Sequence, residues 1–369
     1  MKFDKQMWKE VLGAFIISRL LIVAIGFLSN LIIKKAQWYP QNALSLFDLF
    51  FVWDSNWYLE IVKNGYSYIP GKESSVAFFP LYPMLVKIFS FVFGNPKIVG
   101  FVISNLVLLL ALAYMYKLIR MDYQDSGVTS KSVLYLLIYP TSFFFSIFYT
   151  ESLFLFLSIA TVYYARKKQW LAASILGFFL TLTRSVGFVI MIPLLIEYFG
   201  INFDSYKISI KKLKKDILYL LLVPAGLLIY MAYLYYKFGD PLAFSHAQTA
   251  WGRGLVSVFT TLQSYHLYSA FYKILFLGSI GFALIMIVYL IFSKARFSYI
   301  AYSAVLMFFY LSTNKLEAIP RLISVVFPLY IGMAVLGNKY KIIDQLFTYF
   351  LIMLLTLCTI LFVNGYWFT

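Results

Sequence analysis

Long apolar runs recur along the whole chain, and they exclude an ordinary soluble fold. The chain is 62% hydrophobic and only 12% charged, whereas a soluble domain carries about 25% charged residues. A helix of about 20 apolar residues crosses the hydrocarbon of a bilayer, and the first run, 11–33, has that length. The sequence therefore predicts an all-α, polytopic membrane protein.

Eleven segments are candidate transmembrane helices, and several are shorter than the roughly 20 residues that a full crossing needs. Short spans usually lie inside a bundle or border a water-filled cavity. The apolar run 78–93 is ambiguous, because the prolines near its start and after its end also fit a helix that lies on the outer surface. The eleven candidates are 11–33, 98–119, 132–148, 149–165, 170–183, 185–199, 216–237, 270–292, 299–312, 321–336 and 346–364.

Basic residues predict the orientation of the bundle. The net charge is +16, and cytoplasmic loops of membrane proteins are rich in Lys and Arg. If 78–93 lies on the outer surface, the triplet 166–168 and every other cytoplasmic loop carry this excess. The N-terminus is then cytoplasmic and the C-terminus lies outside. Nucleic acid is not an expected partner, because no soluble basic domain exists to bind it.

This topology leaves two large outer loops, 34–97 and 238–269, in a single membrane-embedded domain, 1–369. Both loops carry aromatic and apolar residues at helical spacing, which favours ordered caps over a cavity. We expect helices that lie parallel to the membrane in the first loop.

Asp54 is the most informative of the acidic residues on the predicted outer side. It lies between Trp53 and Trp57, and a carboxylate among large aromatics beside a membrane is costly to desolvate. It could act as a general base that takes a proton from an incoming hydroxyl. It could equally be the N-cap of an amphipathic helix that tryptophans anchor in the interface.

Glu151 is a second acidic candidate, at the outer turn between two predicted spans. Either it is a turn acid beside Thr150 as a helix cap, or a partner or substrate balances its charge. Four arginines also lie in or beside spans, namely Arg19, Arg184, Arg253 and Arg321. Guanidinium groups suit phosphate oxygens, so several on one outer cavity would suit a lipid phosphate. For Arg321, an ion pair with Glu317 is the alternative.

The second outer loop adds polar candidates. Asp240-Pro241 reads as a helix start, and the short helix that follows would end at Gly252. The polar residues of this loop, together with a tryptophan on which a ring can stack, suit a sugar or a phosphate. They could equally be ordinary exposed residues without a binding role. These residues are His246, Gln248, Trp251 and Arg253. Cys358 is the only cysteine and there are only two histidines, so no disulfide within the chain and no His-rich metal cage is expected. No cofactor is expected, although Asp54, Glu151 and Asp240 could still hold a metal ion.

Six segments in order resemble the PIG-V family, the GPI mannosyltransferase 2 type of multispanning glycosyltransferases with the GT-C fold. Leu322 departs from the family pattern, in which an aromatic residue follows the arginine. The segments are Trp53-Asp54-x-x-Trp57-Tyr58 with Gly65-Tyr66, Ala77-Phe78-Phe79-Pro80-Leu81-Tyr82-Pro83, Pro140-Thr141-Ser142-Phe143-Phe144 with Tyr149-Thr150-Glu151-Ser152, Leu182-Thr183-Arg184-Ser185-Val186-Gly187, Gly239-Asp240-Pro241-Leu242-Ala243-Phe244 through Trp251-Gly252-Arg253, and Pro320-Arg321 with Phe327-Pro328-Leu329.

The resemblance implies an inverting transferase that moves a sugar, mannose or a related hexose, from a polyprenyl-phosphate carrier to an acceptor hydroxyl. The acceptor would be a glycan, a glycolipid or a protein, and Asp54 would be the catalytic base. The short chain without targeting signals for the endoplasmic reticulum looks bacterial, which places the site on the outer face of a cytoplasmic membrane. GPI synthesis would then be the wrong pathway.

These inferences give each candidate a predicted role. Arg184, Arg253 and Arg321 would bind the donor phosphate. A lipid-linked sugar flippase or small-solute transporter is the alternative, but it needs charges along a path through both leaflets, and here the polar candidates gather on one face. The predicted substrate-binding residues are Glu151, Trp53, Trp57, Tyr58, His246, Gln248 and Trp251.

Overall fold

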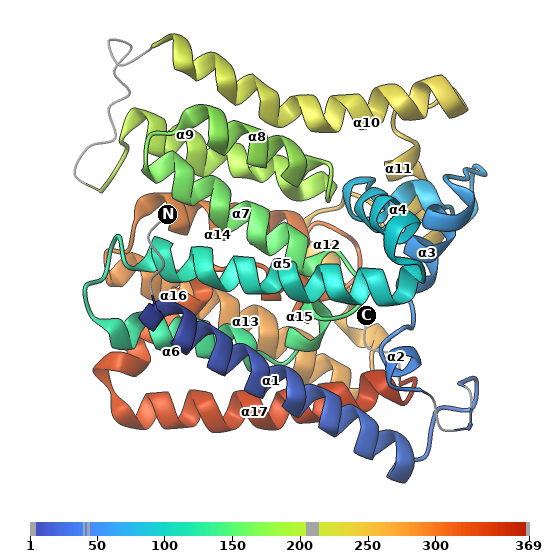
Figure 1. Ribbon diagram of the computed structural model, residues 1–369, viewed down its shortest axis with the longest axis horizontal. Helices are drawn as coiled ribbons and strands as arrows, with labels where there is room; N and C mark the ends of the chain where they lie inside the picture. Colours follow the sequence, from blue (N-terminus) through green and yellow to red (C-terminus); the bar gives the residue numbers. More distant parts are fainter. Residues whose placement is uncertain (1–4, 40, 43–44, 204–213, 367–369) are drawn as a thin grey trace.

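The computed structural model describes residues 5–39, 41–42, 45–203 and 214–366, and within them the chain folds into helices without a β-strand. Figure 1 shows the long helices lying side by side in one bundle. The α-helices are α1 (Lys5–Ile32), α2 (Leu46–Leu49), α3 (Ser55–Asn64), α4 (Leu81–Phe93), α5 (Pro96–Ile119), α6 (Ser126–Leu137), α7 (Glu151–Arg166), α8 (Trp170–Thr181), α9 (Met191–Phe199), α10 (Leu222–Phe238), α11 (Ala243–His246), α12 (Val258–Gln263), α13 (Ala270–Phe292), α14 (Phe297–Tyr310), α15 (Ile319–Ser324), α16 (Pro328–Lys339) and α17 (Lys341–Val363). Short 3₁₀ helices include η1 (Ser75–Ala77), η2 (Ser142–Phe145), η3 (Ser185–Ile190), η5 (Lys215–Leu221), η6 (Ala247–Trp251) and η7 (Ser264–Leu267).

Five helices in the described part of the chain are long and apolar enough to cross a membrane, which makes this a multi-pass integral membrane protein. They are α1, α5, the continuous Lys215–Phe238 helix, α13 and α17, and each coincides with a predicted span. Four shorter apolar helices are Leu81–Phe93, Trp170–Thr181, Ser185–Phe199 and Phe297–Tyr310. The prediction of eleven crossings is therefore confirmed by helix length for five spans only.

Two predicted spans are interrupted helices. The span 132–148 contains the end of α6 and the short η2, and 321–336 contains the end of α15 and most of α16. Prolines explain both interruptions. Pro140 removes a backbone donor and disfavours a helical residue before it, whereas Pro328 occupies the first turn of a new helix.

Arg19 compensates the first interruption. This buried side chain in the middle of α1 donates to the carbonyl oxygens of Ser142 at 2.9 Å and Leu137 at 3.0 Å, and to the Ser146 hydroxyl at 3.0 Å. Non-helical backbone inside a membrane protein needs such partners, because lipid offers none. The position of Arg19 far from either helix end, where snorkelling is difficult, is thereby explained.

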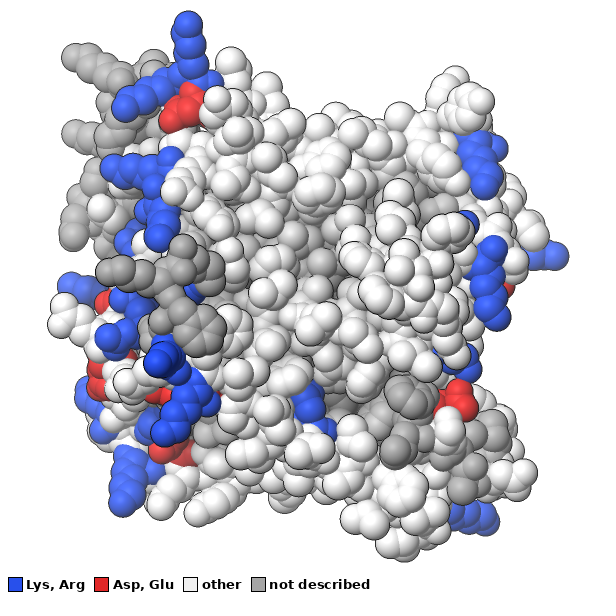
Figure 2. Space-filling view, viewed as in Figure 1, with Lys and Arg blue, Asp and Glu red and all other residues white. Residues whose placement is uncertain are grey.

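The two predicted outer loops meet at one end of the bundle. In Figure 1, α2, α3, α4 and α11 lie together at the right, and α3 and α4 are out of line with the long helices. We call this the loop end. Figure 2 shows Lys and Arg gathered most densely at the opposite, left end, with a mostly uncharged surface between the two ends. We call that the basic end.

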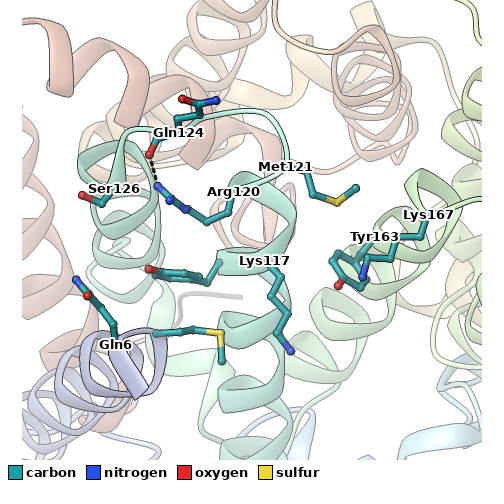
Figure 3. A pocket seen from close by; sticks show the side chains of 10 residues that line it. Gln6, Lys117, Arg120, Met121, Gln124, Ser126, Tyr163 and Lys167 are labelled. Atoms are coloured by element: carbon teal, nitrogen blue, oxygen red, sulfur yellow. Dashed lines mark hydrogen bonds between the residues drawn. The ribbon is translucent and has the colours of Figure 1, made fainter. Parts of the chain in front are cut away.

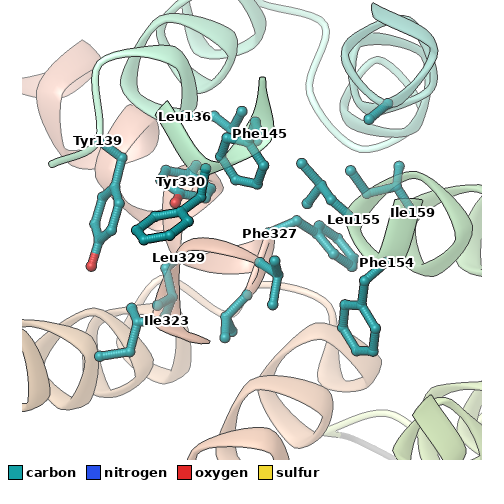
Figure 4. Packing of buried hydrophobic residues seen from close by; sticks show 14 of the residues in the cluster. Leu136, Tyr139, Phe145, Phe154, Leu155, Ile159, Ile323, Phe327, Leu329 and Tyr330 are labelled. Carbon is teal, nitrogen blue, oxygen red and sulfur yellow. The ribbon is translucent and has the colours of Figure 1, made fainter. Parts of the chain in front are cut away.

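An aromatic core fixes the elements that carry the candidate site. Figure 4 shows Phe145 and Phe154 packed near Phe327 and Tyr330, which join η2 and α7 to the start of α16 and the residue before it. All four side chains are essentially inaccessible to solvent. Such dense packing makes the start of α7 and the end of α15 rigid relative to each other.

Candidate active site

Asp54 occupies the N-cap position of α3, but its side chain makes no capping hydrogen bond. Its Oδ2 instead accepts a hydrogen bond from Arg321 Nη1 at 2.7 Å, across 267 residues of sequence. The capping interpretation was thus right about the position and wrong about the interaction of the side chain.

Backbone geometry and Tyr149 set the position of Asp54. Trp53 has a φ of 56°, in the left-handed region that few non-glycine residues adopt. The Tyr149 hydroxyl accepts the Asp54 N–H at 3.0 Å and donates to the Val52 carbonyl oxygen at 3.2 Å. Tyr149 therefore braces the strained turn that presents Asp54, a role that sequence spacing did not reveal.

Glu151 is the first residue of α7 and has no exposed surface. Its Oε1 accepts a hydrogen bond from Arg184 Nη2 and lies 3.6 Å from Arg321 Nε. A buried carboxylate requires such compensation, because removal of its charge from water is costly. Glu151 therefore joins two of the predicted phosphate-binding arginines. We call Asp54, Glu151, Arg184 and Arg321 the carboxylate–arginine cluster.

Neighbouring polar and aromatic side chains hold the two arginines. Thr150 makes no capping hydrogen bond, and its hydroxyl accepts from Arg184 Nε at 2.9 Å. The Arg321 guanidinium lies over the ring of Tyr149, 5.3 Å from its centroid, in a cation–π contact. The suggested Glu317–Arg321 pair is wrong, since Glu317 lies 3.6 Å from Lys315 Nζ instead.

Aromatic residues of both loops meet beside the cluster. Trp57 stacks on Phe78 with ring centroids 5.8 Å apart, and Trp251 packs edge-on against Trp57 at 5.5 Å. Tyr58 packs against Phe78 at 5.1 Å and donates to Thr150 at 3.4 Å. The predicted aromatic residues of α3 and the second loop are therefore in contact with each other.

Trp53 lies on a different side of this aromatic group. Its ring contacts Trp38 at a centroid distance of 4.9 Å. Its Nε1–H is buried and has no hydrogen-bond partner among the residues that the structure describes. A buried indole donor normally has a partner, so this group is available to a ligand.

His246 is directed toward Asp240 and not into the cluster. Its Nδ1 lies 2.7 Å from Asp240 Oδ2, which also accepts from the Tyr68 hydroxyl at 3.0 Å, and 57% of the His246 side chain is exposed. Desolvation raises the pKa of Asp240, but these hydrogen bonds and one from the Leu242 N–H outweigh it and hold the pKa below its usual value. The helix predicted from Pro241 begins at Ala243, while its end at Gly252 is confirmed.

Arg253 is the third predicted phosphate-binding arginine. Its backbone N–H donates to the Gln248 carbonyl oxygen at 3.0 Å. Across the described ranges, no hydrogen bond or ion pair of the Arg253 side chain is found. Burial lowers the pKa of this guanidinium, the Arg321 charge lowers it further, and Asp54 opposes both effects. Arg253 thus lies within electrostatic reach of the Asp54–Arg321 pair.

The cluster retains unused hydrogen-bonding capacity. Glu151 Oε2 and Arg184 Nη1 are buried without a hydrogen-bond partner among the described residues. Buried charged groups without partners are rare and often mark the position of a ligand. For metal ions, no group of three His, Cys, Asp or Glu side chains that could bind one occurs among the described residues.

Comparison with known proteins adds a family to this geometry. The model of the family described as mannosyltransferase (PIG-V) matches residues 15–364. A GPI mannosyltransferase 2 of Drosophila pseudoobscura pseudoobscura is 31% identical over 121 residues, which cover 29% of this chain and 25% of that protein. The matched segment therefore spans about a quarter of that relative.

A solved structure has a similar fold. It is the apo form of the oligosaccharyltransferase of Archaeoglobus fulgidus, with a TM-score of 0.55 and 13% sequence identity. The similarity covers 99% of this chain and 56% of that one. Because the family match extends over nearly the whole helical bundle, the chain belongs to the mannosyltransferase (PIG-V) family.

Proposed function

We propose that this protein transfers mannose, or a related hexose, from a polyprenyl-phosphate carrier to the hydroxyl of a glycan, glycolipid or protein acceptor. The observation that carries this proposal is the carboxylate–arginine cluster. Four segments far apart in sequence bring it together in a chain of a mannosyltransferase family. An accessible carboxylate beside buried guanidinium groups supplies both a base and a phosphate site.

The charge of the site matches the donor. Arg184, Arg253 and Arg321 face Asp54 and Glu151, which leaves one net positive charge. A polyprenyl-phosphate sugar is a phosphodiester with one negative charge, so it neutralises this excess. The phosphate gains charge as its bond to the sugar breaks, and preorganised guanidinium groups stabilise that change. Arg253 and the free Arg184 Nη1 are the first contacts available to the phosphate.

Asp54 suits the general base better than Glu151 does. The Asp54 side chain is 29% exposed, whereas Glu151 is fully buried between arginines. Asp54 Oδ2 accepts a hydrogen bond from Arg321 Nη1 at 2.7 Å, which occupies one of the two carboxylate oxygens. A donor phosphate that draws Arg321 away from Asp54 would free this oxygen to accept the hydroxyl proton at the moment when the donor is in place.

The chemical step follows from these roles. The acceptor oxygen attacks the anomeric carbon as Asp54 removes the hydroxyl proton. The bond between that carbon and the phosphate oxygen breaks on the opposite face, so the configuration inverts. Polyprenyl phosphate leaves with the electron pair, and the arginines balance its second negative charge.

The remaining candidates lie on the two loops that meet beside this centre. Trp57 and Trp251 offer ring faces and edges on which a sugar can pack, and Tyr58 contacts the same Phe78 ring as both tryptophans. Glu151 positions Arg184 and Arg321, and its free Oε2 is the atom that would orient a substrate. His246 and Gln248 lie on the second loop, where an acceptor bound beside Trp251 would meet them.

The proposed location is the outer face of a bacterial cytoplasmic membrane. Lys and Arg are concentrated at the basic end, as the positive-inside rule requires of the cytoplasmic side. The loop end, toward which the cluster lies, would then face outward. On this view the acceptor belongs to the cell envelope.

The test is a donor panel with purified full-length protein in detergent. Polyprenyl-phosphate mannose and its glucose analogue are incubated with candidate acceptors, and released polyprenyl phosphate and new glycoside are both measured. The proposal expects stoichiometric release and glycoside formation with the mannosyl donor. Sugar movement into liposomes without glycoside formation would support the flippase alternative and refute the proposed transferase activity.

A further inference from the structure

Helix α7 connects the carboxylate–arginine cluster with the opposite end of the bundle. It begins at Glu151, a member of the cluster, and its 16 residues end at Arg166, about 24 Å away. Near that second end, Tyr163 and Lys167 line a cavity of about 650 Å³ at the basic end (Figure 3). Side chains that reach α7 from a neighbouring helix therefore meet it at different depths of the bundle.

Tyrosines of α14 follow α7 along its length. Tyr299 accepts a hydrogen bond from Arg166 Nη1 at 3.0 Å, at the end of α7. Tyr302 donates to the Ser158 hydroxyl at 2.9 Å, in the middle of α7. Tyr310 lies about three helical turns after Tyr299 and so on the same face of α14. Because the two helices run in opposite directions, Tyr310 comes to the level of the start of α7.

Tyr310 reaches the carboxylate–arginine cluster. Its neighbour Phe309 packs edge-on against Phe188 of η3 with ring centroids 5.1 Å apart, and η3 directly follows Arg184. The charges of Arg184 and Glu151 both act on the Tyr310 hydroxyl, although neither side chain forms a hydrogen bond with it. Tyr310 is only 2% exposed, and its hydroxyl has no hydrogen-bond partner among the residues that the structure describes.

The unpartnered atoms of Glu151 and Tyr310 define the ligand that fits between them. A buried polar atom without a partner is costly, so such atoms often await a ligand. Glu151 Oε2 can only accept a hydrogen bond, whereas the Tyr310 hydroxyl can donate one. An alcohol satisfies both atoms, because its hydroxyl donates one bond and accepts others. An ionised phosphate oxygen only accepts, and the carboxylate would repel it.

We propose that Glu151 and Tyr310 together recognise one hydroxyl group of the transferred hexose. The hydroxyl donates to Glu151 Oε2 and accepts from the Tyr310 hydroxyl, while Arg184 Nη1 stays available to the donor phosphate. This role rests on the proposed function and adds to it a residue that determines which sugar is accepted. The sugar enters at the edge formed by Asp54 and Arg184, whose side chains are 29% and 15% exposed.

Donor affinity tests this proposal without requiring turnover. Binding of polyprenyl-phosphate mannose and of each monodeoxy analogue to the full-length protein in detergent is followed by tryptophan fluorescence. We expect one analogue to bind the wild type roughly 10–150-fold more weakly than the parent donor, because Glu151 Oε2 then loses its partner. In Tyr310→Phe the parent donor should bind about 2–12-fold more weakly. The same analogue should lose no further affinity, whereas the other analogues should lose as much as the parent.

Tyr302→Phe is the matched control, because it removes a buried phenol hydroxyl of the same helix outside the cluster. It should lower the unfolding temperature, since the bond to Ser158 is lost, and leave donor affinity unchanged. Tyr310→Phe should do the reverse, because its hydroxyl has no protein partner to lose.

Two results for Tyr310→Phe would overturn the proposal. One is unchanged affinity for the parent donor, and the other is an equal loss for the parent and every analogue. Donor binding to the wild type without turnover would contradict the transfer reaction alone, because the affinities still report the hydroxyl contact. Absence of donor binding to the wild type would overturn both.

Discussion

Replacement of Glu151 by Gln removes the charge that joins two buried arginines while it preserves the shape of the side chain. Arg184 and Arg321 then retain Asp54 as the only carboxylate within the cluster. The amide can still accept a hydrogen bond from Arg184, so the expected loss is electrostatic. Mannosyl transfer should also fall, because both guanidinium groups lose the anchor that sets their position.

The magnitude follows from the geometry. At separations of about 4 Å and an effective dielectric constant near 20, each Arg–Glu contact contributes about 4 kcal/mol before desolvation. Loss of one partner from a buried pair costs roughly 3–5 kcal/mol, because the remaining charge is unpaired. For a chain of 369 residues, an unfolding entropy of about 2.1 cal/mol/K per residue converts this into a fall of about 4–6 °C in Tm.

Thermal unfolding in detergent, followed by circular dichroism, measures the effect. Arg184→Gln, Glu151→Gln and the double variant form a cycle, in which we expect the double variant to lose at least about 1 kcal/mol less than the sum. Asp48→Asn is the matched control, because the side chains of the Asp48–Lys97 pair are 46% and 36% exposed, so solvent screens the pair and it should contribute about 0–1 kcal/mol. Additive losses, or a Glu151→Gln effect as small as that of the control, would refute the assigned pairing.

Three further predictions concern other parts of the structure, and each is measured by the same unfolding assay. Gly226→Ala should cost about 1–3 kcal/mol, because the new Cβ would lie 2.4 Å from a backbone oxygen of α8, whereas Gly278→Ala meets nothing within 4 Å and should be harmless. Arg19→Met should cost about 1–3 kcal/mol, because it leaves the Ser142 carbonyl oxygen without its donor, whereas the Leu137 carbonyl oxygen keeps the bond from the Ser142 hydroxyl at 2.6 Å. Asp240 has a lowered folded-state pKa. Its stabilising contribution, measured against Asp240→Asn, should therefore be complete well above pH ~3.9 and disappear as the pH falls below that value.

Local chemistry was enough to predict the members of the cluster but not their pairing. Aromatic neighbours singled out Asp54, and the position between apolar spans singled out Glu151. The Asp54–Arg321 bond joins residues 267 positions apart, and no spacing rule connects such positions. Sequence proximity favoured Glu317 for Arg321 instead, because helical neighbours interact at three- and four-residue spacing. Tertiary packing decided between these partners.

The helix boundaries were also predicted only in part from local sequence. Continuous apolar runs such as those of α5 and α13 were placed to within two residues, whereas α1 begins at Lys5, before the predicted start at residue 11. The runs 132–148 and 321–336 were equally apolar, yet prolines divide them into short elements. Hydropathy does not distinguish a continuous transmembrane helix from an interrupted one. A side chain of another helix can supply the hydrogen bonds that the carbonyl groups at the interruption lack. For the run 132–148 that helix is α1, through Arg19.

The most direct test of the central claim is mannosyl transfer by Asp54→Asn, measured together with binding of the polyprenyl-phosphate donor. A missing general base should lower turnover about 10²–10⁴-fold, while the amide preserves the shape of the site and donor affinity stays close to that of the wild type. Glu60→Gln, on the exposed side of the same helix α3, should retain full activity. Turnover of Asp54→Asn equal to that of Glu60→Gln would contradict the assignment of Asp54 as the base.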